Sequence, residues 1–458
     1  MGVCASSDAQ VGDTSDDPNT PLQHPSPPPE SPSGSRTASS PGPSSSSGFK
    51  VFAGTFNING SPLSSVDVES WLASHGASSC DLICLAFQEC ATCSWSSDVL
   101  SDLVNMGGRE QIGMNERNDN EFINTILNSL DSRFEIIGDK AIGEPPTSRK
   151  VEIEGVKTEW YGFIRLVVLR AVASQVDVGR IIPFECACGS KLSMFPPHHY
   201  PPDSAPDKGA VGFLLEGQKL LVSSLHLTGT NKYGVPEMNF DNDRRRQLDK
   251  ISKAIETSFD NYPPEELETE SSSAAPTSSS FRVPLTYYRK VIMGDLNFRC
   301  ELFPSVEDKA KGGRDFAAVN EVAMSGESDA LESLFFAGDR LQRWLRMRGV
   351  WSLPEVLPRT IPQEPDPQSF GPPEEPIPSI LQATEDALPL TRSLVKKPFP
   401  PPTFTFKIGE APPRAFNDKR TPSWTDRILV SNLSVLDVGT ERTVVISDHE
   451  PVYALLSV

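Results

Sequence analysis

Residues 291–299 read VIMGDLNFR, an apolar run of strand-forming residues that runs into Gly294, Asp295 and Asn297. Side chains two positions apart project from the same face of a strand, so Asp295 and Asn297 can share one site at its tip. The same three residues also suit an Asx turn, in which side chains only bond the local backbone. The stretch therefore predicts a buried strand with two polar residues at its end, and the rest of the chain has to decide between site and turn.

The chain contains several strand candidates, and some of them end in the same way. They are short, apolar and rich in β-branched residues: KVFAGTFNI, DLICLAFQ, FIRLVVLRAV, KLLVSSLHL, YYRKVIMGDL, DRILV and VYALLSV. Segments with helical periodicity lie between them, among them DNEFINTILNSLDS, DNDRRRQLDKISKAIETS and ESLFFAGDRLQRWLRM. Residues able to bind cations, protons or phosphate stand at or just beyond the strand ends: Asn57, Glu89, His226, Asp295, Asn297, Asp426, Asp448 and His449. So many residues of these types in equivalent places predict one shared site.

Composition limits the chemistry of that site. The 458 residues carry a formal net charge of −19, which argues against nucleic-acid binding but allows a local basic pocket. No apolar run reaches the roughly 20 residues of a membrane span. Eight cysteines, with no secretory signal visible, favour the reducing cytosol. The cysteines that flank one hydrophobic run are expected to be core thiols rather than zinc ligands: Cys80, Cys84, Cys90 and Cys93.

The candidate site is built mainly from oxygen donors, which suit Mg²⁺ rather than zinc. A carboxylate that binds Mg²⁺, an Asp–Asn pair beside a water and a histidine beside a phosphoryl oxygen together describe metal-assisted hydrolysis of a phosphate ester. The chain has no Gly-rich phosphate loop, which argues against a kinase or a nucleotide-hydrolysing motor.

The first residues, MGVCASS, match the pattern for N-myristoylation, with Gly2 as the acceptor and Cys4 beside it as a candidate for palmitoylation. One myristoyl chain binds a membrane weakly, so a stable anchor needs a second acyl chain or a basic patch. Arg36 is the only lysine or arginine before residue 50, which leaves Cys4 as the second signal. The alternative is an ordinary flexible start. The expected location is the cytoplasm and the cytoplasmic face of a membrane such as the plasma membrane.

Residues 1–47 are rich in Ser, Pro, Asp and Thr and poor in large apolar residues, so we expect an acylated, disordered tether. One catalytic domain is expected over residues 48–458. Two biased stretches inside it, at about 263–285 and 354–402, are expected to be long disordered loops, because strand-like segments resume after each of them.

The order of the motifs resembles the inositol polyphosphate 5-phosphatases, a family of the endonuclease/exonuclease/phosphatase superfamily. TFNING, FQE, DKGAV, SSLHL, GDLNFR, KRTPSWTDRIL and SDHEPV follow one another over about residues 48–458. GDLN and SDH are shared with relatives such as apurinic endonucleases and deadenylases, whereas KRTPSWTDRIL is typical of the 5-phosphatases. The resemblance implies an α/β fold, a four-layer α-β-β-α sandwich of two packed mixed sheets flanked by helices, with the active site at one rim.

The resemblance also implies a role for each residue at the strand ends. The Mg²⁺ ligands would be Glu89, Asn57 and Asp448. The catalytic residues would be Asp295 at the attacking water, Asn297 at the water or the phosphate, and His449 at the phosphoryl oxygen, with Asp426 and His226 in support. Substrate phosphates would be contacted by Lys208, Arg427, Lys419 and Arg420, which make the surface positive locally although the chain is acidic.

Three positions depart from the family pattern. Asp207 stands where the family has Asn, LTGT follows His226 in place of Ala-Ala-His, and Thr405 replaces a lysine, with Lys407 two positions further on. None of these removes an expected metal ligand or base. The expected activity is therefore Mg²⁺-dependent hydrolysis of the 5-phosphate of phosphoinositides, such as phosphatidylinositol 4,5-bisphosphate or 3,4,5-trisphosphate, and of soluble inositol polyphosphates, with no nucleic-acid partner. The alternatives are a nuclease or deadenylase of the same superfamily and a catalytically silent, membrane-tethered scaffold.

Overall fold

The computed structural model describes residues 48–90, 115–130, 133–142, 151–153, 156–158, 164–189, 208–229, 237–260, 284–302, 313–352, 376–389 and 397–458. The chain divides into two units, Met1–Ser47 and Gly48–Val458, and all of these ranges belong to the second. The expected tether with Gly2 and Cys4 lies outside the described residues, as do Cys93 and Asp207.

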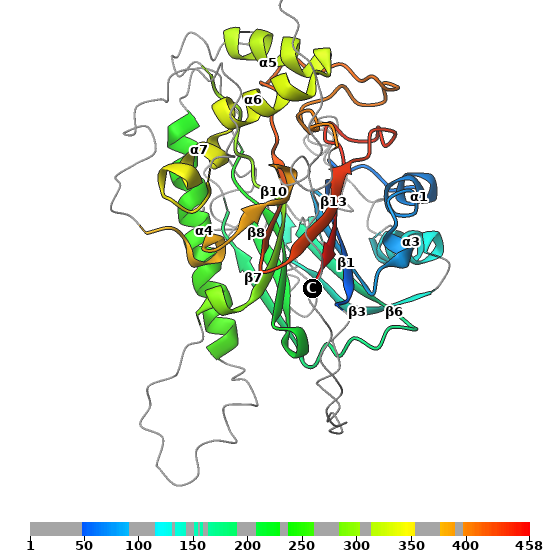
Figure 1. Cartoon of the computed structure of the whole chain (residues 1–458). Helices are drawn as coiled ribbons and strands as arrows, with labels where there is room; N and C mark the ends of the chain where they lie inside the picture. Colours follow the sequence, from blue (N-terminus) through cyan, green and yellow to red (C-terminus); the bar gives the residue numbers. More distant parts are fainter. Residues whose placement is uncertain are drawn as a thin grey trace, which may run out of the picture. The chain divides into compact units, whose positions relative to one another are not determined.

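Two six-stranded mixed sheets form the body of Gly48–Val458 (Figure 1). The first has the order β13-β14-β1-β2-β6-β3, with β1 Lys50–Asn57, β2 Leu82–Gln88, β3 Phe134–Ala141, β6 Ile164–Ala171, β13 Ser434–Thr440 and β14 Val452–Ser457. The second has the order β11-β12-β10-β9-β8-β7, with β7 Ile181–Ala187, β8 Gly209–Leu215, β9 Leu220–His226, β10 Arg289–Asp295, β11 Glu385–Asp386 and β12 Asp426–Ser431. Each sheet has one parallel pair, β1 with β2 and β9 with β10. A separate short hairpin is formed by β4 Val151–Ile153 and β5 Val156–Thr158.

Helices cover the outer faces of both sheets (Figure 1). Trp71 of α1 (Ser65–Leu72) and Ile126 of α3 (Asn115–Ser129) pack in one apolar cluster with Phe87 of β2. On the second sheet, Leu248 of α4 (Glu237–Asp260) and Trp344 of α7 (Arg340–Met347) pack in another. The remaining helical segments are α5 Arg314–Ser325, α6 Ser328–Gly338, η1 Ala77–Ser79, η2 Glu216–Gln218, η4 Leu285–Tyr287 and η7 Ser379–Leu381. The expected fold of two packed mixed sheets flanked by helices is confirmed.

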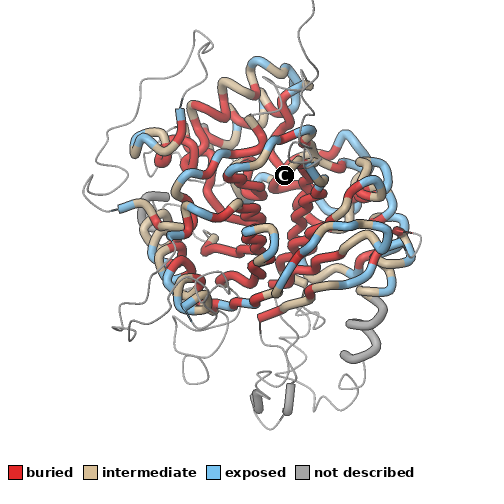
Figure 2. The backbone as a smooth tube through the Cα atoms, turned by 60° about the horizontal axis from the view of Figure 1, so that its bottom comes forward, coloured by how far each residue is buried: buried red, intermediate tan, exposed pale blue. Residues whose placement is uncertain are grey.

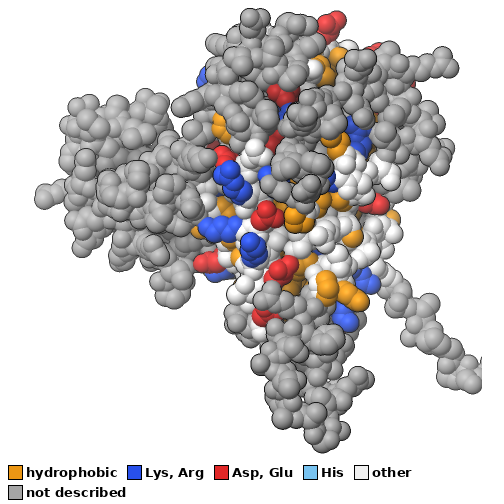
Figure 3. Space-filling model, turned by 90° about the vertical axis from the view of Figure 1, so that its left-hand side faces the viewer, with side chains coloured by type: hydrophobic (Ala, Val, Ile, Leu, Met, Phe, Trp, Pro, Cys, Tyr) orange, Lys and Arg blue, Asp and Glu red, His pale blue; other side chains and the backbone are white. Residues whose placement is uncertain are grey.

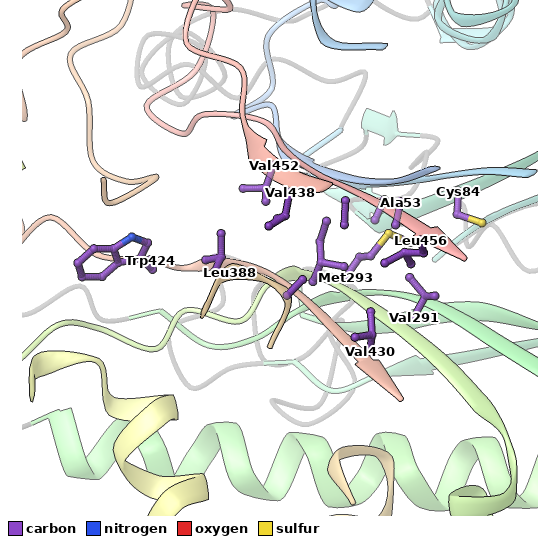
Figure 4. Packing of buried hydrophobic residues seen from close by; sticks show 14 of the residues in the cluster. Ala53, Cys84, Val291, Met293, Leu388, Trp424, Val430, Val438, Val452 and Leu456 are labelled. Carbon is purple, nitrogen blue, oxygen red and sulfur yellow. The ribbon is translucent and has the colours of Figure 1, made fainter. Parts of the chain in front are cut away.

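The main core lies between the two sheets. Ala53 and Leu456 from the first sheet face Val291, Met293 and Val430 from the second (Figure 4). Because helices cover the opposite faces, the inner strands are buried on both sides, and they read as continuous apolar runs rather than as alternating ones. Figure 2 shows the same distribution, with buried backbone in the middle of the molecule and exposed backbone towards its margin.

Two of the clustered cysteines lie in these cores. Cys80 and Cys84 are buried, and burial raises the pKa of their thiols to about 11 and about 12. Thiols that stay protonated in this way are poor zinc ligands. The expectation of core thiols is confirmed for this pair, and Cys90 is partly exposed.

The helical segment ESLFFAGDRLQRWLRM forms two helices, α6 and α7, which are separated at Asp339. The backbone of Asp339 is extended (φ −69°, ψ 120°), and its carboxylate caps α7 by accepting a hydrogen bond from the Gln342 amide (2.9 Å). The same carboxylate accepts hydrogen bonds from Arg427. A periodic pattern does not reveal this break, because the capping aspartate is held by a residue from a distant strand.

Part of the stretch 354–402, expected to be a loop, belongs to the second sheet instead. β11 pairs with β12, and Ile380 and Leu381 of η7 are buried in the cluster that covers the sheet. Lys290 holds this segment, because its Nζ donates hydrogen bonds to three backbone carbonyls, those of Ser379, Ile380 and Gln382 (3.2, 3.3 and 2.6 Å). The prediction of a loop is wrong for these residues. The proline-rich composition of the stretch gives no sign of the few apolar side chains that pack onto the second sheet.

Acidic and basic side chains alternate on the face of the molecule that carries α4 (Figure 3). Arg246 and Asp243 of this helix, for example, form an ion pair of 3.1 Å one turn apart. Among the described residues, none of the helices combines the length and the apolar character that a membrane crossing requires.

Candidate active site

Strand register in the first sheet brings Asn57 and Glu89 to the same edge. Asn57 is the last residue of β1 and pairs with Gln88, the last residue of the parallel strand β2. Glu89 follows directly, with a left-handed backbone (φ 50°) that turns the chain out of the strand. A positive φ is unfavourable for a glutamate and is typical of functional sites.

Strand register in the second sheet brings three more polar residues together. Asp295 ends β10, where it pairs with His226, the last residue of the parallel strand β9. On its other side it pairs with Asp426, the first residue of the antiparallel strand β12. His226, Asp295 and Asp426 therefore lie in a row across the sheet, and at most 2% of each residue is exposed.

Side chains of the two sheets meet around Asp295. Asn57 Nδ2 donates to Asp295 Oδ2 (3.0 Å) and to Glu89 Oε1 (3.3 Å). His226 Nε2 lies 3.5 Å from Asp295 Oδ2 and 3.7 Å from Glu89 Oε1. The two carboxylates thus share one amide and one imidazole, which places Glu89 and Asp295 in a single site.

His449, from the loop before β14, completes the cluster. Its Nδ1 lies 2.9 Å from Asp426 Oδ2, and its Nε2 lies 3.9 Å from Asp295 Oδ2. Asp426 is itself fixed, because Oδ2 accepts hydrogen bonds from the hydroxyls of Thr403 (2.7 Å) and Thr425 (3.1 Å). The imidazole therefore has one nitrogen anchored and the other directed towards the middle of the site.

The electrostatics favour a protonated His449 beside an ionised Asp295. Burial alone lowers the pKa of His449, but the charge of Asp426 and its hydrogen bond raise it to about 9. Burial likewise raises the pKa of Asp295, but the hydrogen bond from His226 and the charges of His449 and His226 hold that pKa well below its usual range. At neutral pH the site therefore offers a fixed proton donor next to a fixed anion.

The contacts of Asp295 decide between the two alternatives that the sequence left open, a shared site and an Asx turn. Its Oδ1 accepts a hydrogen bond from the Asn297 backbone amide (3.0 Å), which is an Asx turn, and Asn297 has a left-handed backbone (φ 57°). Its other oxygen, Oδ2, faces Asn57 and His226. The turn and the site are both present, because each uses a different oxygen of one carboxylate.

Glu89 is the most accessible of the predicted metal ligands, since 40% of its side chain is exposed. Burial raises the pKa of Glu89, but the charges of His226, Lys208 and His449 outweigh it and lower the pKa below its ordinary value. Asp448, with 28% of its side chain exposed, lies close to the same cluster, 4.0 Å from His449 Nε2. Two ionised carboxylates that share one amide, with a third nearby, fit a divalent cation, which would offset their mutual repulsion.

The orientation of the Asn57 side chain distinguishes it from the other predicted metal ligands. Its NH₂ group faces Glu89 and Asp295, and its oxygen accepts a hydrogen bond from the Asn59 amide (3.1 Å). Asn57 therefore braces these two carboxylates rather than supplying an oxygen ligand to a cation.

Asp295, Asp426 and His449 could also hold a metal, because one ligand atom from each lies within 4.8 Å of the others. However, Asp426 is already hydrogen-bonded to His449 and to two threonine hydroxyls, which favours a role in orienting the imidazole.

Two of the four predicted substrate cations lie at the cluster. Lys208 Nζ is 2.5 Å from His226 Nε2, and the Arg420 guanidinium lies 5.8 Å from the centre of the Phe404 ring. That ring packs on the imidazole of His449, with 4.4 Å between ring centres. Lys419 is exposed beside Arg420, and its backbone amide donates to the Asn417 side chain.

Arg427 is placed elsewhere, which corrects the expectation that it contacts substrate phosphate. Successive residues of β12 point to opposite faces, so Arg427 turns away from the site that Asp426 enters. Its side chain is fully buried, with Nη1 3.0 Å from both carboxylate oxygens of Asp339 and Nη2 hydrogen-bonded to Asp386. The guanidinium also lies over the Phe335 ring. Arg427 joins β12 to α7 and β11.

The site contains two further residues that strand-end patterns do not reveal. Arg299 donates from Nη2 to Asn297 Oδ1 (2.5 Å), and its guanidinium carbon lies 4.3 Å from the centre of the Phe404 ring. The sequence signal for Arg299 is the alternation of Asp295, Asn297 and Arg299 in GDLNFR. No comparable signal marks Phe404, because its position depends on pairing with Ser423 and His449.

A model of Endonuclease/Exonuclease/phosphatase family 2 matches residues 383–455 of the chain. The matched segment carries Asp426, Asp448 and His449, together with Phe404 and KRTPSWTDRIL, whereas Asn57, Glu89, His226 and Asp295 lie outside it. No curated protein matches the chain.

Solved structures of several kinds resemble the chain at low identity. An inositol polyphosphate 5-phosphatase domain of SPsynaptojanin, in complex with inositol (1,4)-bisphosphate and calcium ion, is 16% identical, covers 90% of this chain and 84% of its own, and gives a TM-score of 0.49. A ferrous NO complex of Cimex nitrophorin is 11% identical, with 90% and 98% covered and a TM-score of 0.45. An endonuclease/exonuclease/phosphatase of Beutenbergia cavernae is 13% identical, with 90% and 72% covered and a TM-score of 0.38. Similarities at this level do not indicate a shared function.

Proposed function

We propose that this chain is a Mg²⁺-dependent phosphatase of the endonuclease/exonuclease/phosphatase superfamily that removes the 5-phosphate from phosphoinositides and from soluble inositol polyphosphates. The observation that carries the proposal is the position of Asp295. Its ionised carboxylate lies between His226 (3.5 Å) and His449 (3.9 Å), and Asn57 of the other sheet donates to it (3.0 Å). An anion held between donors at the edge of two sheets suits the activation of a water for attack on a phosphate ester.

Each residue of the cluster has a defined part in the proposed reaction. Asp295 orients the water and accepts its proton. His449 donates from Nε2 to a phosphoryl oxygen, because Asp426 occupies its Nδ1. Asn297 helps to hold the site in shape. Its Oδ1 accepts a hydrogen bond from Arg299, and its Nδ2 donates to the Leu227 carbonyl (2.9 Å).

A divalent cation would be held by Glu89, with Asp448 near it and Asn57 as a brace. Oxygen donors and a partly exposed carboxylate favour Mg²⁺. When bound, such a cation polarises a phosphoryl oxygen and neutralises negative charge that develops on it. The residues of the chain complete this neutralisation with the protonated His449 and with Lys208, which lies beside His226.

Three observations favour an inositol phosphate over a nucleic acid. KRTPSWTDRIL, the motif typical of 5-phosphatases, lies inside the segment that the family model matches. The described residues place positive groups locally at the site, among them Lys208 and Arg420. A net charge of −19 is unfavourable for binding a nucleic-acid backbone, which is recognised by a basic surface.

Two parallel assays test the proposal, phosphate release from inositol compounds and strand cleavage or nucleotide release from nucleic acids. Equal amounts of protein, with and without Mg²⁺, are given phosphatidylinositol 4,5-bisphosphate, soluble inositol polyphosphates, abasic duplex DNA and polyadenylated RNA. We expect Mg²⁺-dependent release from the inositol compounds and a loss of at least about 100-fold in Asp295→Ala, the scale of a lost acid–base group. The matched control is Asp243→Asn on the surface of α4, which should retain activity.

Faster cleavage of either nucleic acid than of the inositol compounds would overturn the assignment in favour of a nuclease or deadenylase. Binding of the inositol compounds without hydrolysis would make the chain a silent scaffold. Activity that is unchanged in Asp295→Ala would refute the assigned role of the carboxylate even if the substrate class is right.

A further inference from the structure

Arg299 occupies an unusual position behind the proposed active site. It follows β10 by four residues, and only 4% of it is exposed. Its backbone is fixed independently of its side chain, because its carbonyl accepts a hydrogen bond from the Arg340 amide (3.2 Å) and the next amide, that of Cys300, donates to the Ser423 hydroxyl (3.0 Å). The backbone from which the guanidinium projects is therefore held by contacts that do not involve the side chain.

One arm of the guanidinium fixes Asn297. Arg299 Nη2 donates to Asn297 Oδ1 at 2.5 Å, while Asn297 Nδ2 donates to the Leu227 carbonyl at 2.9 Å. Both ends of the amide are thereby committed. Gly229 lies against this pair, since a Cβ at that position would come within 3.0 Å of Asn297 Oδ1. Loss of the arginine would leave the amide with one of its two anchors.

The flat face of the same guanidinium supports His449 through Phe404. The guanidinium carbon lies 4.3 Å from the centre of the Phe404 ring, a cation–π distance. The Phe404 ring in turn packs on the imidazole of His449, with 4.4 Å between ring centres and 36° between ring planes. Phe404 is 2% exposed, so its ring has little freedom to reorient.

Asn297 and His449 come from different sheets. Asn297 follows β10 in the second sheet, whereas His449 precedes β14 in the first. We propose that Arg299 is a positioning residue that joins these two halves of the active site, holding Asn297 by a hydrogen bond and His449 through the ring of Phe404. The inference rests on the proposed function for its effect on turnover, but the contact with Asn297 can be measured without it.

The first test is a double-mutant cycle on phosphate release by the full chain. Because misplaced groups cost about 10- to 100-fold in rate, Arg299→Ala should lower kcat by that factor while changing KM by less than about threefold. Arg299→Lys keeps the charge but not the flat, forked group, so it should also lose about tenfold. In an Asn297→Ala background, Arg299→Ala should lower kcat by a smaller factor than in wild type, because only the support of His449 through Phe404 is still lost.

The matched control is Arg289→Ala at the opposite end of β10, where Nη1 donates to the Gln218 carbonyl (3.0 Å). This variant should leave kcat within about twofold of wild type, since surface changes far from the site have small effects. Equal losses from Arg299→Ala in the wild-type and Asn297→Ala backgrounds would refute a positioning role, as would full activity in Arg299→Lys.

The second test needs no turnover. In protein labelled with ¹⁵N-asparagine, the side-chain amide of Asn297 is identified as the pair of signals absent from Asn297→Ala. Its hydrogen exchange should accelerate at least about tenfold in Arg299→Ala and Arg299→Lys, because the amide loses one of its two anchors, and should not change in Arg289→Ala. Unchanged exchange in both Arg299 variants would overturn the inference. Accelerated exchange in both variants, together with no hydrolysis of any substrate by wild type, would overturn only the proposed function.

Discussion

His449 Nδ1 lies 2.9 Å from Asp426 Oδ2, and this hydrogen bond connects the loop before β14 in the first sheet to the first residue of β12 in the second. The imidazole depends on the carboxylate for its orientation and charge, and the carboxylate depends on the imidazole to compensate its burial.

Removing either member of this pair should therefore remove the function of both. Asp426→Asn and His449→Ala should each lower kcat by about 100-fold, and the double variant should be little worse than His449→Ala, because residues that act as a unit are not additive. Steady-state kinetics of the three variants measure this. Losses that simply multiply would show that the two side chains act independently.

The pH dependence of the reaction should follow His449. Because its pKa is raised to about 9, we expect kcat/KM to fall above about pH 9 as the proton donor is lost. In Asp426→Asn the carboxylate that raises this pKa is absent, so the fall should move to lower pH. A pH profile whose alkaline limb is the same in wild type and Asp426→Asn would contradict the assignment of the proton to His449.

The raised pKa of His449 should also make the stability of the fold depend on pH. A histidine whose pKa rises from 6.5 when unfolded to about 9 when folded stabilises the protein fully below about pH 6.5 and progressively less as the pH rises to 9. The free energy of unfolding of wild type, measured in urea, should fall by a few kcal/mol across this window. His449→Asn should show a flatter dependence in the same window, and an unchanged slope would indicate that another group is responsible.

Arg427 should matter for stability. Replacing it by methionine leaves Asp339 and Asp386 as two buried carboxylates without their cation, which typically costs about 3 to 5 kcal/mol. Thermal unfolding of Arg427→Met should show this loss, while Arg420→Met, which removes a partly exposed guanidinium at the site, should unfold like wild type. A fully stable Arg427→Met would mean that the buried ion pairs are not needed to hold α7 and β11 in place.

The membrane anchor expected from Gly2 and Cys4 lies outside the described residues and stays a prediction. Myristate alone binds reversibly, whereas two acyl chains anchor stably. Gly2→Ala should therefore make the protein soluble in cell fractionation, and Cys4→Ser should leave a weak, exchanging membrane association. Equal solubility of wild type and Gly2→Ala would show that Gly2 does not anchor the protein to a membrane.

The strand ends of the site could be predicted from sequence because their geometry is simple. Parallel neighbours such as β9 and β10 end at the same edge, so His226 and Asp295 meet there once both strands are recognised. The roles of Asp426 and Arg427 could not be separated in the same way. They are adjacent in β12 and point to opposite faces, and only the three-dimensional structure shows which face meets the site and which meets α7.

Contacts between distant segments account for the rest. The partners of Arg427 are 41 and 88 residues away, and one of them, Asp386, lies in a proline-rich stretch that resembles a loop. The stack of Arg299, Phe404 and His449 likewise brings together three loops whose proximity no periodic pattern records. Local patterns predict strands and their ends, but not which side chains from remote loops pack between them.

The order of the strands has a consequence for how the protein is made. β1 begins the described domain, yet its antiparallel neighbour in the sheet is β14, the last strand, and the Val458 amide donates to the Phe49 carbonyl (3.0 Å). During synthesis, β1 leaves the ribosome with one edge unpaired until residues 452–457 follow it. At about 5 to 20 residues per second, that exposed edge persists for tens of seconds. Until β14 is made, His449 is also missing from the chain, and the unpaired edge of β1 is open to pairing with other chains.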